Sequence, residues 1–264
     1  MSHNLLILAA GYATRMGTLT ERQAKPLLDV AGRPMMDWVM DRFVCIPGLA
    51  RVVVVTNSKF YDDFSAWQQS YQSGSARPEF TLIEDGSTGI ADKLGAIGDL
   101  SFAIEAEGLW DRDLVVVGGD NLFEQAPVDF VEFSAGRPVV IGTCDVGSPD
   151  EVRRFASIET DADWRITAFE EKPASPAGTV AGIALYGFQR EVLPLVGDYL
   201  EEGNNPDQAG HLIGWMRGKV ETFGYPIRGR WFDVGSAESL AEADRVFRCI
   251  GGLDSGCVDQ SSRT

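Results

Sequence analysis

Four short apolar segments alternate with helical patterns over the first half of this 264-residue chain. The segments expected to form strands are 5–10 (LLILAA), 51–56 (RVVVVT), 80–84 (FTLIE) and 113–119 (DLVVVGG). Helices are expected near 34–44, 59–71 and 89–104. Strands that are apolar along their whole length and separated by helices are typical of a parallel sheet covered on both faces. The sequence therefore predicts an α/β fold whose ligands bind at the carboxyl ends of the strands.

After residue 138 the pattern changes to strand-like segments that follow one another without helices. These segments are RPVVIGTCDV, FASIET, RITAFEEKP and TVAGIALYGF, and later VETFGYP and RWFDVG. Helices are expected at about 190–202, 209–218 and 236–248. We predict a Rossmann-like mixed sheet flanked by helices, with a smaller antiparallel lobe. One domain should span residues 1–248, in two halves of about 1–137 and 138–248, and 249–264 should form a flexible tail.

The chain is strongly acidic, with 39 Asp and Glu against 23 Lys and Arg and a formal net charge of −16. Such a surface disfavours nucleic acid and anionic membranes, because phosphate groups demand a basic face. We expect no nucleic-acid partner and no membrane partner. A phosphorylated ligand would have to be held by a few local cations, backbone N–H groups or a metal ion.

The cysteines and the first residues predict a cytoplasmic protein. The four cysteines (Cys45, Cys144, Cys249 and Cys257) form no CxxC pair, and with two histidines in the chain we expect reduced thiols and no zinc site. The segment LLILAA is short and lacks the basic flank of a signal peptide. No apolar run approaches the length of a membrane span.

The first expected strand ends in a loop that could bind an anion. The segment 6–17 (LILAAGYATRMG) leaves the strand through Ala9, Ala10 and Gly11 and then places Arg15. It lacks the second glycine of a dinucleotide fingerprint and the closing Gly-Lys-Ser/Thr of a P-loop. By itself the loop is equally consistent with a glycine turn followed by a solvated arginine.

The residues that follow resemble the sugar-1-phosphate nucleotidylyltransferases. That family opens with a signature like LAAGxGTRxxPLT…KPLLxVxxKP, and this chain has Arg15, then Lys25 before Pro26, then AGRPMMDW. It departs from the signature at Ala13, where a second glycine is usual, and at Arg33, where lysine is usual. Further resembling segments, over roughly residues 4–247, are GSTGIADKLGAI, VVVGGDNLFE, ITAFEEKP, TVAGIALYGF and RGRWFDVGSAESLAEA.

The resemblance implies an enzyme that joins a nucleoside triphosphate to a sugar 1-phosphate. A sugar-phosphate oxygen would attack the α-phosphorus and release pyrophosphate, so that catalysis would rest on positioning and electrostatic stabilisation. The cofactor implied is magnesium (Mg²⁺), a hard cation that favours one or two carboxylates with phosphate oxygens and water. Self-association into a homo-oligomer is expected from the resemblance alone.

The resemblance also assigns site residues. The catalytic cations are Arg15 and Lys25, and the metal ligands are Asp120 and Asp233. The sugar-phosphate residues are Glu171, Lys172 and Gly182. The nucleotide-binding residues are Leu8, Ala9, Ala10, Gly11, Glu84 and Gly89.

The nucleobase and the sugar are left open. Glu84 stands where many thymidylyltransferases have glutamine, and its carboxylate suits a base with a ring N–H, namely thymine, uracil or guanine. Ala156 replaces a glycine that is frequent in sugar-binding relatives. The default substrates are dTTP and glucose 1-phosphate, with UTP, GTP or CTP and another sugar or cyclitol phosphate as alternatives. A non-catalytic relative that binds a nucleotide sugar and regulates a partner is the alternative of another class.

Overall fold

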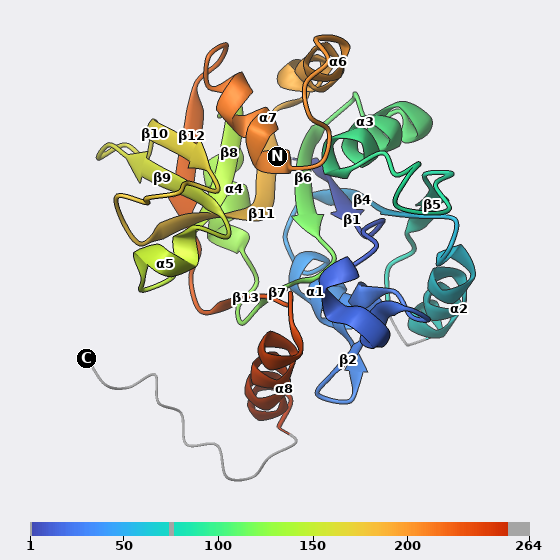
Figure 1. The fold of residues 1–264 in the computed structure, drawn as a ribbon. Helices are drawn as coiled ribbons and strands as arrows, with labels where there is room; N and C mark the ends of the chain where they lie inside the picture. Colours follow the sequence, from blue (N-terminus) through green and yellow to red (C-terminus); the bar gives the residue numbers. More distant parts are fainter. Residues whose placement is uncertain (1, 74–76, 253–264) are drawn as a thin grey trace.

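The computed structural model describes residues 2–73 and 77–252, and a nine-stranded mixed sheet runs through this part of the molecule (Figure 1). The strand order is β10-β9-β11-β6-β1-β4-β5, and β8 pairs with β11 and β12. The strands of the first half are β1 (His3–Leu8), β4 (Leu49–Thr56), β5 (Thr81–Glu84) and β6 (Asp113–Gly118). They run parallel, with β1 between β4 and β6, as the apolar segments predict.

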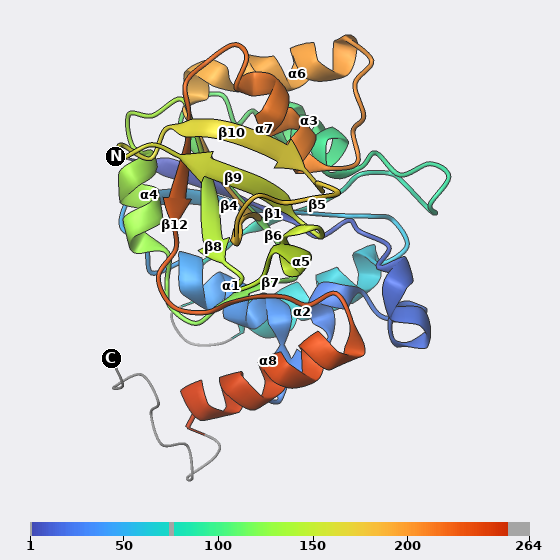
Figure 2. The ribbon, with the colours of Figure 1, turned by 60° about the vertical axis from the view of Figure 1, so that its left-hand side comes forward.

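Helices cover both faces of the sheet (Figure 2). One face packs against α1 (Met35–Phe43), α2 (Tyr61–Gln72) and α8 (Ala237–Ile250), and the other against α3 (Ala96–Glu107), α6 (Pro194–Glu201) and α7 (Ala209–Met216). The central strands are therefore buried on both sides: Leu5, Leu6 and Ile7 of β1 are inaccessible to solvent. This double burial explains why their sequences carry no polar alternation.

Helix α3 begins later than the sequence predicts. The segment from residue 89 is a loop, because the Asp92 carboxylate accepts hydrogen bonds from the backbone N–H groups of Thr88 and Gly89. The helix starts only after Gly95, whose φ of 79° favours glycine. The N–H of Ile97 then donates to the carbonyl oxygen of Pro206 at 2.8 Å and ties the helix start to the second half of the chain.

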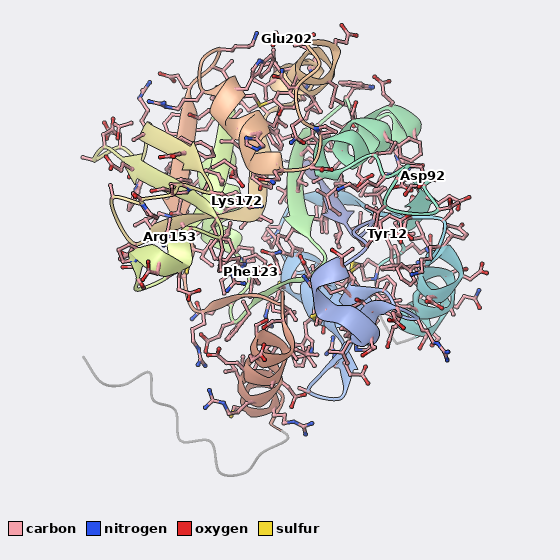
Figure 3. All side chains as sticks on the ribbon, in the orientation of Figure 1. Tyr12, Asp92, Phe123, Arg153, Lys172 and Glu202 are labelled. Atoms are coloured by element: carbon pink, nitrogen blue, oxygen red, sulfur yellow. The ribbon has the colours of Figure 1, made fainter. Side chains whose placement is uncertain are left out.

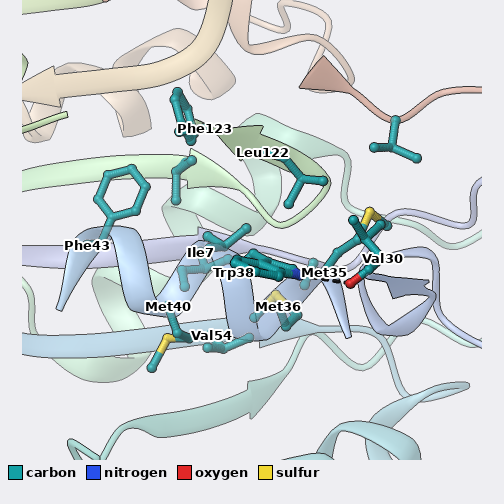
Figure 4. Close-up of a cluster of buried hydrophobic side chains, with 14 of the residues drawn as sticks. Ile7, Val30, Met35, Met36, Trp38, Met40, Phe43, Val54, Leu122 and Phe123 are labelled. Carbon is teal, nitrogen blue, oxygen red and sulfur yellow. Dashed lines mark hydrogen bonds between the residues drawn. The ribbon is translucent and has the colours of Figure 1, made fainter. Parts of the chain in front are cut away.

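The core beneath α1 is built from methionine, aromatic and aliphatic side chains (Figure 4). Trp38 is buried, and its indole N–H donates to the carbonyl oxygen of Val30 at 2.9 Å. Its ring meets Phe247 of α8 edge to face, with centroids 4.9 Å apart. The last predicted helix is thereby held against the first.

Strand β11 carries the sheet from the first half into the second. It pairs antiparallel with β6, β8 and β9. The strands added there are β8 (Val139–Asp145), β9 (Ala156–Thr160), β10 (Ile166–Glu171), β11 (Val180–Phe188) and β12 (Thr222–Pro226). The predicted mixed sheet with an antiparallel addition is confirmed. The addition is not wholly antiparallel, because β12 pairs with β8 in parallel.

Two short helices occur where none was predicted, α4 (Val128–Ser134) at the end of the first half and α5 (Pro149–Val152) in the second half. Two small ladders lie outside the main sheet: β2 (Asp29–Val30) with β3 (Arg33–Pro34), and β7 (Asn121–Phe123) with β13 (Trp231–Asp233). The ladder of β7 and β13 joins segments about a hundred residues apart in the sequence. It places Asp233 opposite Asn121, the residue that follows Asp120.

Cys45 and Cys144 carry free thiols, whereas Cys249 is disulfide-bonded. The expectation of reduced thiols is therefore wrong at Cys249, and Cys257 lies outside the described residues. The tail was predicted to begin at residue 249, but helix α8 continues to Ile250. Residues 253–264 of the predicted tail lie outside the described residues. No helix in the part of the chain that the structure describes has the length and hydropathy of a membrane span.

Candidate active site

A cavity of about 500 Å³ opens at the carboxyl ends of β1 and β6. Its wall contains six of the predicted site residues: Leu8, Ala10, Gly11, Asp120, Glu171 and Gly182. Figure 3 shows Tyr12 and Asp92 on one side of the molecule, and Lys172 and Arg153 on the other. The cavity thus lies between the first and second halves of the chain, where a ligand of each could meet.

The loop after β1 is held by the end of β4. The N–H of Ala9 donates to the carbonyl oxygen of Val55, and the side-chain amide of the buried Asn57 donates to the carbonyl oxygen of Ala10, both at 2.8 Å. Ala9 is therefore engaged within the sheet and is absent from the cavity wall. A Cβ on Gly11 would meet no protein atom, so the missing side chain leaves room for a ligand.

The next residues turn sharply into a 3-10 helix, η1 (Thr14–Thr20). Ala13 precedes it with φ of 48°, a left-handed conformation that glycine would adopt without strain. This agrees with the glycine that relatives have at that position. The backbone of Arg15 lies in η1, but its side chain is outside the described part of the structure, so its predicted role stays a prediction.

Lys25 and Asp120 form an ion pair beside the cavity. Lys25 lies in the buried 3-10 helix η2 (Lys25–Leu27), and its Nζ contacts Oδ2 of Asp120. The other carboxylate oxygen accepts a hydrogen bond from the side-chain amide of Asn121 at 2.8 Å. Burial by itself would raise the pKa of the Asp120 carboxyl, but Lys25 and Asn121 hold it below its ordinary value. Asp120 is therefore a charged and oriented carboxylate.

Two glycines before Asp120 make this arrangement possible. A Cβ on Gly118 would lie 2.6 Å from Nδ2 of Asn121 and 2.9 Å from Oδ1 of Asp120. A Cβ on Gly119 would lie 3.2 Å from Cγ of Pro26, next to Lys25. The Gly-Gly-Asp sequence thus lets the end of β6 approach the segment that carries the lysine.

The ladder of β7 and β13 brings Asp233 beside Asp120. Asp233 pairs with Asn121 across the ladder, and the N–H of Val234 donates to the carbonyl oxygen of Asp120 at 3.3 Å. Nη2 of Arg154 lies 3.6 Å from Oδ2 of Asp233. Two aspartates predicted from segments far apart in the sequence therefore lie on adjoining stretches of backbone, each with a cationic partner.

On the opposite side, Glu171 ends β10 and faces the cavity. Burial raises the pKa of its carboxyl, and the charges of Lys172 and His211 oppose this in part. A Cβ on Gly210, at the start of α7, would overlap the Glu171 carboxylate, so only glycine fits beside it. Gly182 also lines the cavity, and a Cβ there would lie 2.7 Å from Cδ1 of Ile158.

Lys172, Glu84 and Gly89 are not part of the cavity wall. Lys172 is exposed, with φ of 49°. Glu84 is exposed at the end of β5. The amide of Gly89 donates to Asp92, within its own loop. Their predicted contacts with substrates stay predictions.

Several polar residues of the wall were not anticipated from the sequence. They are Tyr12, Lys93, Asp99, Arg154, Asp207 and Gln208. Lys93 forms an ion pair with Asp207 at 2.9 Å, so that the loop before α3 is tied to the loop before α7. For Tyr12 a signal was present, because it directly follows the predicted loop glycine. The others come from loops and helix ends whose approach depends on the tertiary fold.

Comparison with known proteins first identifies the protein family. Residues 4–248 match the nucleotidyl transferase family. Because this match covers most of the chain, the protein belongs to that family. The predicted resemblance to sugar-1-phosphate nucleotidylyltransferases is thereby confirmed.

Individual relatives narrow the comparison further. The chain is 29% identical over 258 residues to a glucose-1-phosphate adenylyltransferase of Thermosipho melanesiensis, with 90% of this chain and 60% of that protein covered. It is also 29% identical over 254 residues to a glucose-1-phosphate adenylyltransferase of Clostridium acetobutylicum, with 90% and 65% covered. The chain thus spans less than two thirds of the length of these two relatives.

The fold is similar to a crystal structure assigned as a glucose-1-phosphate thymidylyltransferase from Bacillus anthracis in complex with a sucrose. The TM-score is 0.79, and 94% of this chain and 96% of that chain are covered. The sequences are 21% identical, so this likeness concerns the fold alone.

Proposed function

We propose that this protein is a magnesium-dependent nucleotidylyltransferase that joins a nucleoside triphosphate and a sugar 1-phosphate, forming a nucleoside-diphosphate sugar and pyrophosphate. The observation that carries the proposal is that the ladder of β7 and β13 brings the segment of Asp233 next to Asp120, which is paired with Lys25 and lines the cavity between the two halves of the chain. Family membership supports it. The reaction needs no nucleophile from the protein, because the sugar phosphate attacks the α-phosphorus itself.

The residues present fit a magnesium ion. In the described residues no group of three or more His, Cys, Asp or Glu side chains could hold a metal. Magnesium does not require one, because it is usually bound by one or two carboxylates, with phosphate oxygens and water completing the octahedron. Asp120 and Asp233 would hold it, and when bound it would neutralise charge on the phosphates.

The cations of the chain divide between the two substrates. Lys25 would neutralise the triphosphate and the departing pyrophosphate, with Arg15 as its predicted companion. Arg154, which lines the cavity beside Asp233, and the predicted Lys172 would hold the sugar phosphate. Glu171 would accept hydrogen bonds from sugar hydroxyls. The β1 loop, from Leu8 to Gly11, would cradle the nucleotide.

The substrates are proposed in two steps. Glucose 1-phosphate is the first candidate for the sugar phosphate, because the two adenylyltransferases compared above are named for it. For the nucleotide, dTTP is the default that the sequence resemblance gives. ATP becomes a further candidate because two similar proteins are named adenylyltransferases. Cytoplasmic location and self-association also stay predictions.

The proposal is tested by measuring pyrophosphate release with magnesium across ATP, CTP, GTP, UTP and dTTP, each with several sugar 1-phosphates. Release should require both substrates and the metal, and chelation should abolish it. If no pairing releases pyrophosphate, the proposal fails and the regulatory alternative is favoured.

A further inference from the structure

Two carboxyl groups lie side by side on the nucleotide side of the cavity. Asp85 follows β5, and Asp99 lies in the first turn of α3 and lines the cavity. They are only 9% and 6% exposed, respectively. Oδ1 of Asp85 accepts hydrogen bonds from the backbone N–H and the hydroxyl of Ser87, at 2.7 and 2.8 Å. Oδ1 of Asp99 is buried and has no hydrogen-bond donor from the protein.

The surroundings of Asp99 favour its protonated form. Burial raises its pKa most, and the charge of Asp85 and a hydrogen bond with that carboxyl add to the effect, giving a pKa of about 8. Lys93 acts in the opposite direction, but its ammonium group is paired with Asp207 at 2.9 Å.

The other titratable groups nearby add no positive charge. Tyr12 reaches this corner from the β1 loop, and its hydroxyl lies 3.0 Å from Oγ of Ser87. Asp92, in the same loop as Asp85, carries a carboxylate whose pKa is lowered by hydrogen bonds from Thr88 and Gly89. The corner therefore contains Asp85, Asp92, Tyr12 and a lysine that is already paired.

This corner is the part of the cavity where the proposed function places the nucleobase. Asp120 follows β6, next to the strand that joins the two halves, so the reacting phosphates belong near the middle of the cavity. Glu171 and Arg154 belong to the second half, on the sugar side. The base would then point away from them, towards β5 and α3. Asp99 is a buried side chain of that wall, and its Oδ1 has no hydrogen-bond partner among the described residues.

We propose that Asp99 determines which nucleobase is accepted, by presenting a protonated carboxyl to a ring-nitrogen acceptor and the amino group beside it, the edge that adenine and cytosine share. This inference rests on the proposed function. A carboxylate can only accept hydrogen bonds, whereas a neutral carboxyl both donates and accepts. Thymine, uracil and guanine present a ring N–H, for which a charged carboxylate would serve. The chain instead buries Asp99 beside a second carboxyl, which disfavours the charge.

The test is steady-state kinetics with ATP, CTP, GTP, UTP and dTTP at a series of pH values. At neutral pH, ATP or CTP should be used about tenfold more efficiently than dTTP, because an unpaired buried polar group is costly. With a pKa of about 8, raising the pH from about 7 to about 9 should reduce this preference roughly tenfold. Asp99→Asn keeps a donor and an acceptor, so its preference should lose the pH dependence. Asp99→Ala should lose the preference itself.

Asp62→Asn, a change at an exposed carboxylate on α2, is the matched control and should alter neither the preference nor its pH profile. A wild-type preference for dTTP, UTP or GTP would overturn the inference, as would an unchanged base ranking in Asp99→Ala. Equilibrium dialysis with the same triphosphates, without sugar phosphate, measures base preference independently of turnover. Failure of turnover with every nucleotide would count against the proposed function, and dialysis would still decide the inference.

Discussion

The carboxylate of Asp120 has both of its oxygens engaged, one by Lys25 and the other by Asn121. Lys25 thus supplies a positive charge at this carboxylate. Its position next to Pro26, against the end of β6, makes the ion pair a fixed feature of the fold rather than a contact between two flexible side chains. A charge that is oriented in advance needs little rearrangement when phosphates arrive.

Replacing Asp120 with asparagine keeps the size of the side chain but removes its charge. We expect turnover to fall by a hundredfold or more, since the lost metal stabilisation is worth roughly 3 kcal/mol. The measurement is pyrophosphate release against magnesium concentration, with Asp63→Asn on the exposed face of α2 as control. Full activity of Asp120→Asn in excess chelator would refute the metal assignment.

The raised pKa of Asp99 also leads to a prediction about the free energy of unfolding. Its folded-state pKa of about 8 lies above the ordinary value of 3.8, so between these values the folded chain binds a proton that the unfolded chain does not. This group therefore favours the folded state increasingly as the pH falls from about 8 to about 4. Asparagine carries no charge in either state, so Asp99→Asn should raise the free energy of unfolding by about 4 kcal/mol at neutral pH, and the gain should vanish near pH 4.

The measurement for this second prediction is denaturant unfolding of both proteins over that pH range. Subtracting the two curves removes the contribution of all other titrating groups. A gain that is independent of pH would show that Asp99 is not the group responsible.

At the scale of elements, the start of α7 is shaped by its contact with β10. Gly210 has no side chain because the Glu171 carboxylate occupies the space. The helix is eight residues long, and its other face packs into the core through Leu212 and Ile213. Its first turn can therefore not shift away without disturbing the core, so the Glu171 carboxylate is held in place by the helix.

Gly210→Ala should displace Glu171 and raise the Michaelis constant for the sugar phosphate several-fold, with little change for the nucleotide. The matched control is Gly197→Ala in α6, where an added Cβ would meet no atom within 4 Å and should slightly stabilise the helix. Steady-state kinetics in both substrates gives the result. Equal effects on the two Michaelis constants would contradict the assignment of Glu171 to the sugar side.

At the scale of the whole molecule, strand pairing joins the two halves of the chain at two places around the cavity. Strand β11 continues the sheet from β6 into the second half, and β13 pairs with β7 next to Asp120. A third link is the ion pair of Lys93 with Asp207. With one substrate proposed for each half, changes in the two halves should affect different kinetic constants.

Lys25→Ala should mainly lower the turnover number, because its charge matters most as pyrophosphate separates. Lys172→Ala should mainly raise the Michaelis constant for the sugar phosphate. Lys219→Ala is the control, since that exposed lysine pairs with Glu202 outside the cavity. The reverse pattern would show that the two lysines belong to each other's substrate. An unaffected Lys172→Ala would leave Arg154 as the cation for the sugar phosphate.

Sequence patterns were most informative where a residue's role follows from its neighbours along the chain. The buried strands β1, β4 and β6 were predicted because double burial excludes polar residues from them. Asp120 was assigned from the family resemblance, and its place directly after such a strand agrees with that assignment. The start of α3 was predicted too early, because a side-chain cap by Asp92 stabilises a loop that otherwise reads as helix. The short helices α4 and α5 were missed, because four to seven residues carry too little periodicity to be recognised.

Glu84 and Asp99 illustrate what lay beyond the sequence. Leu82 packs into the cluster beneath α1, whereas Ile83 packs into the cluster with α3. Because side chains alternate across a strand, Glu84 shares the face of Leu82 and points away from α3. That leaves Asp99, fifteen residues later, in the cavity wall. The sequence could not show which of the two carboxyl groups lines the cavity. The answer depends on the register of β5 and on the residue where α3 begins.

By itself, the sequence determined the α/β class and the parallel strands, because hydrophobic periodicity is a local property, and its resemblance to a known family assigned the carboxylates and cations of the site. Only the tertiary structure decided which of these groups meet. It placed Asp233 beside Asp120, put Asp99 rather than Glu84 in the cavity wall and linked Lys93 to Asp207. Each of these contacts joins segments whose distance is set by strand pairing and helix packing, and a linear pattern carries no measure of that distance.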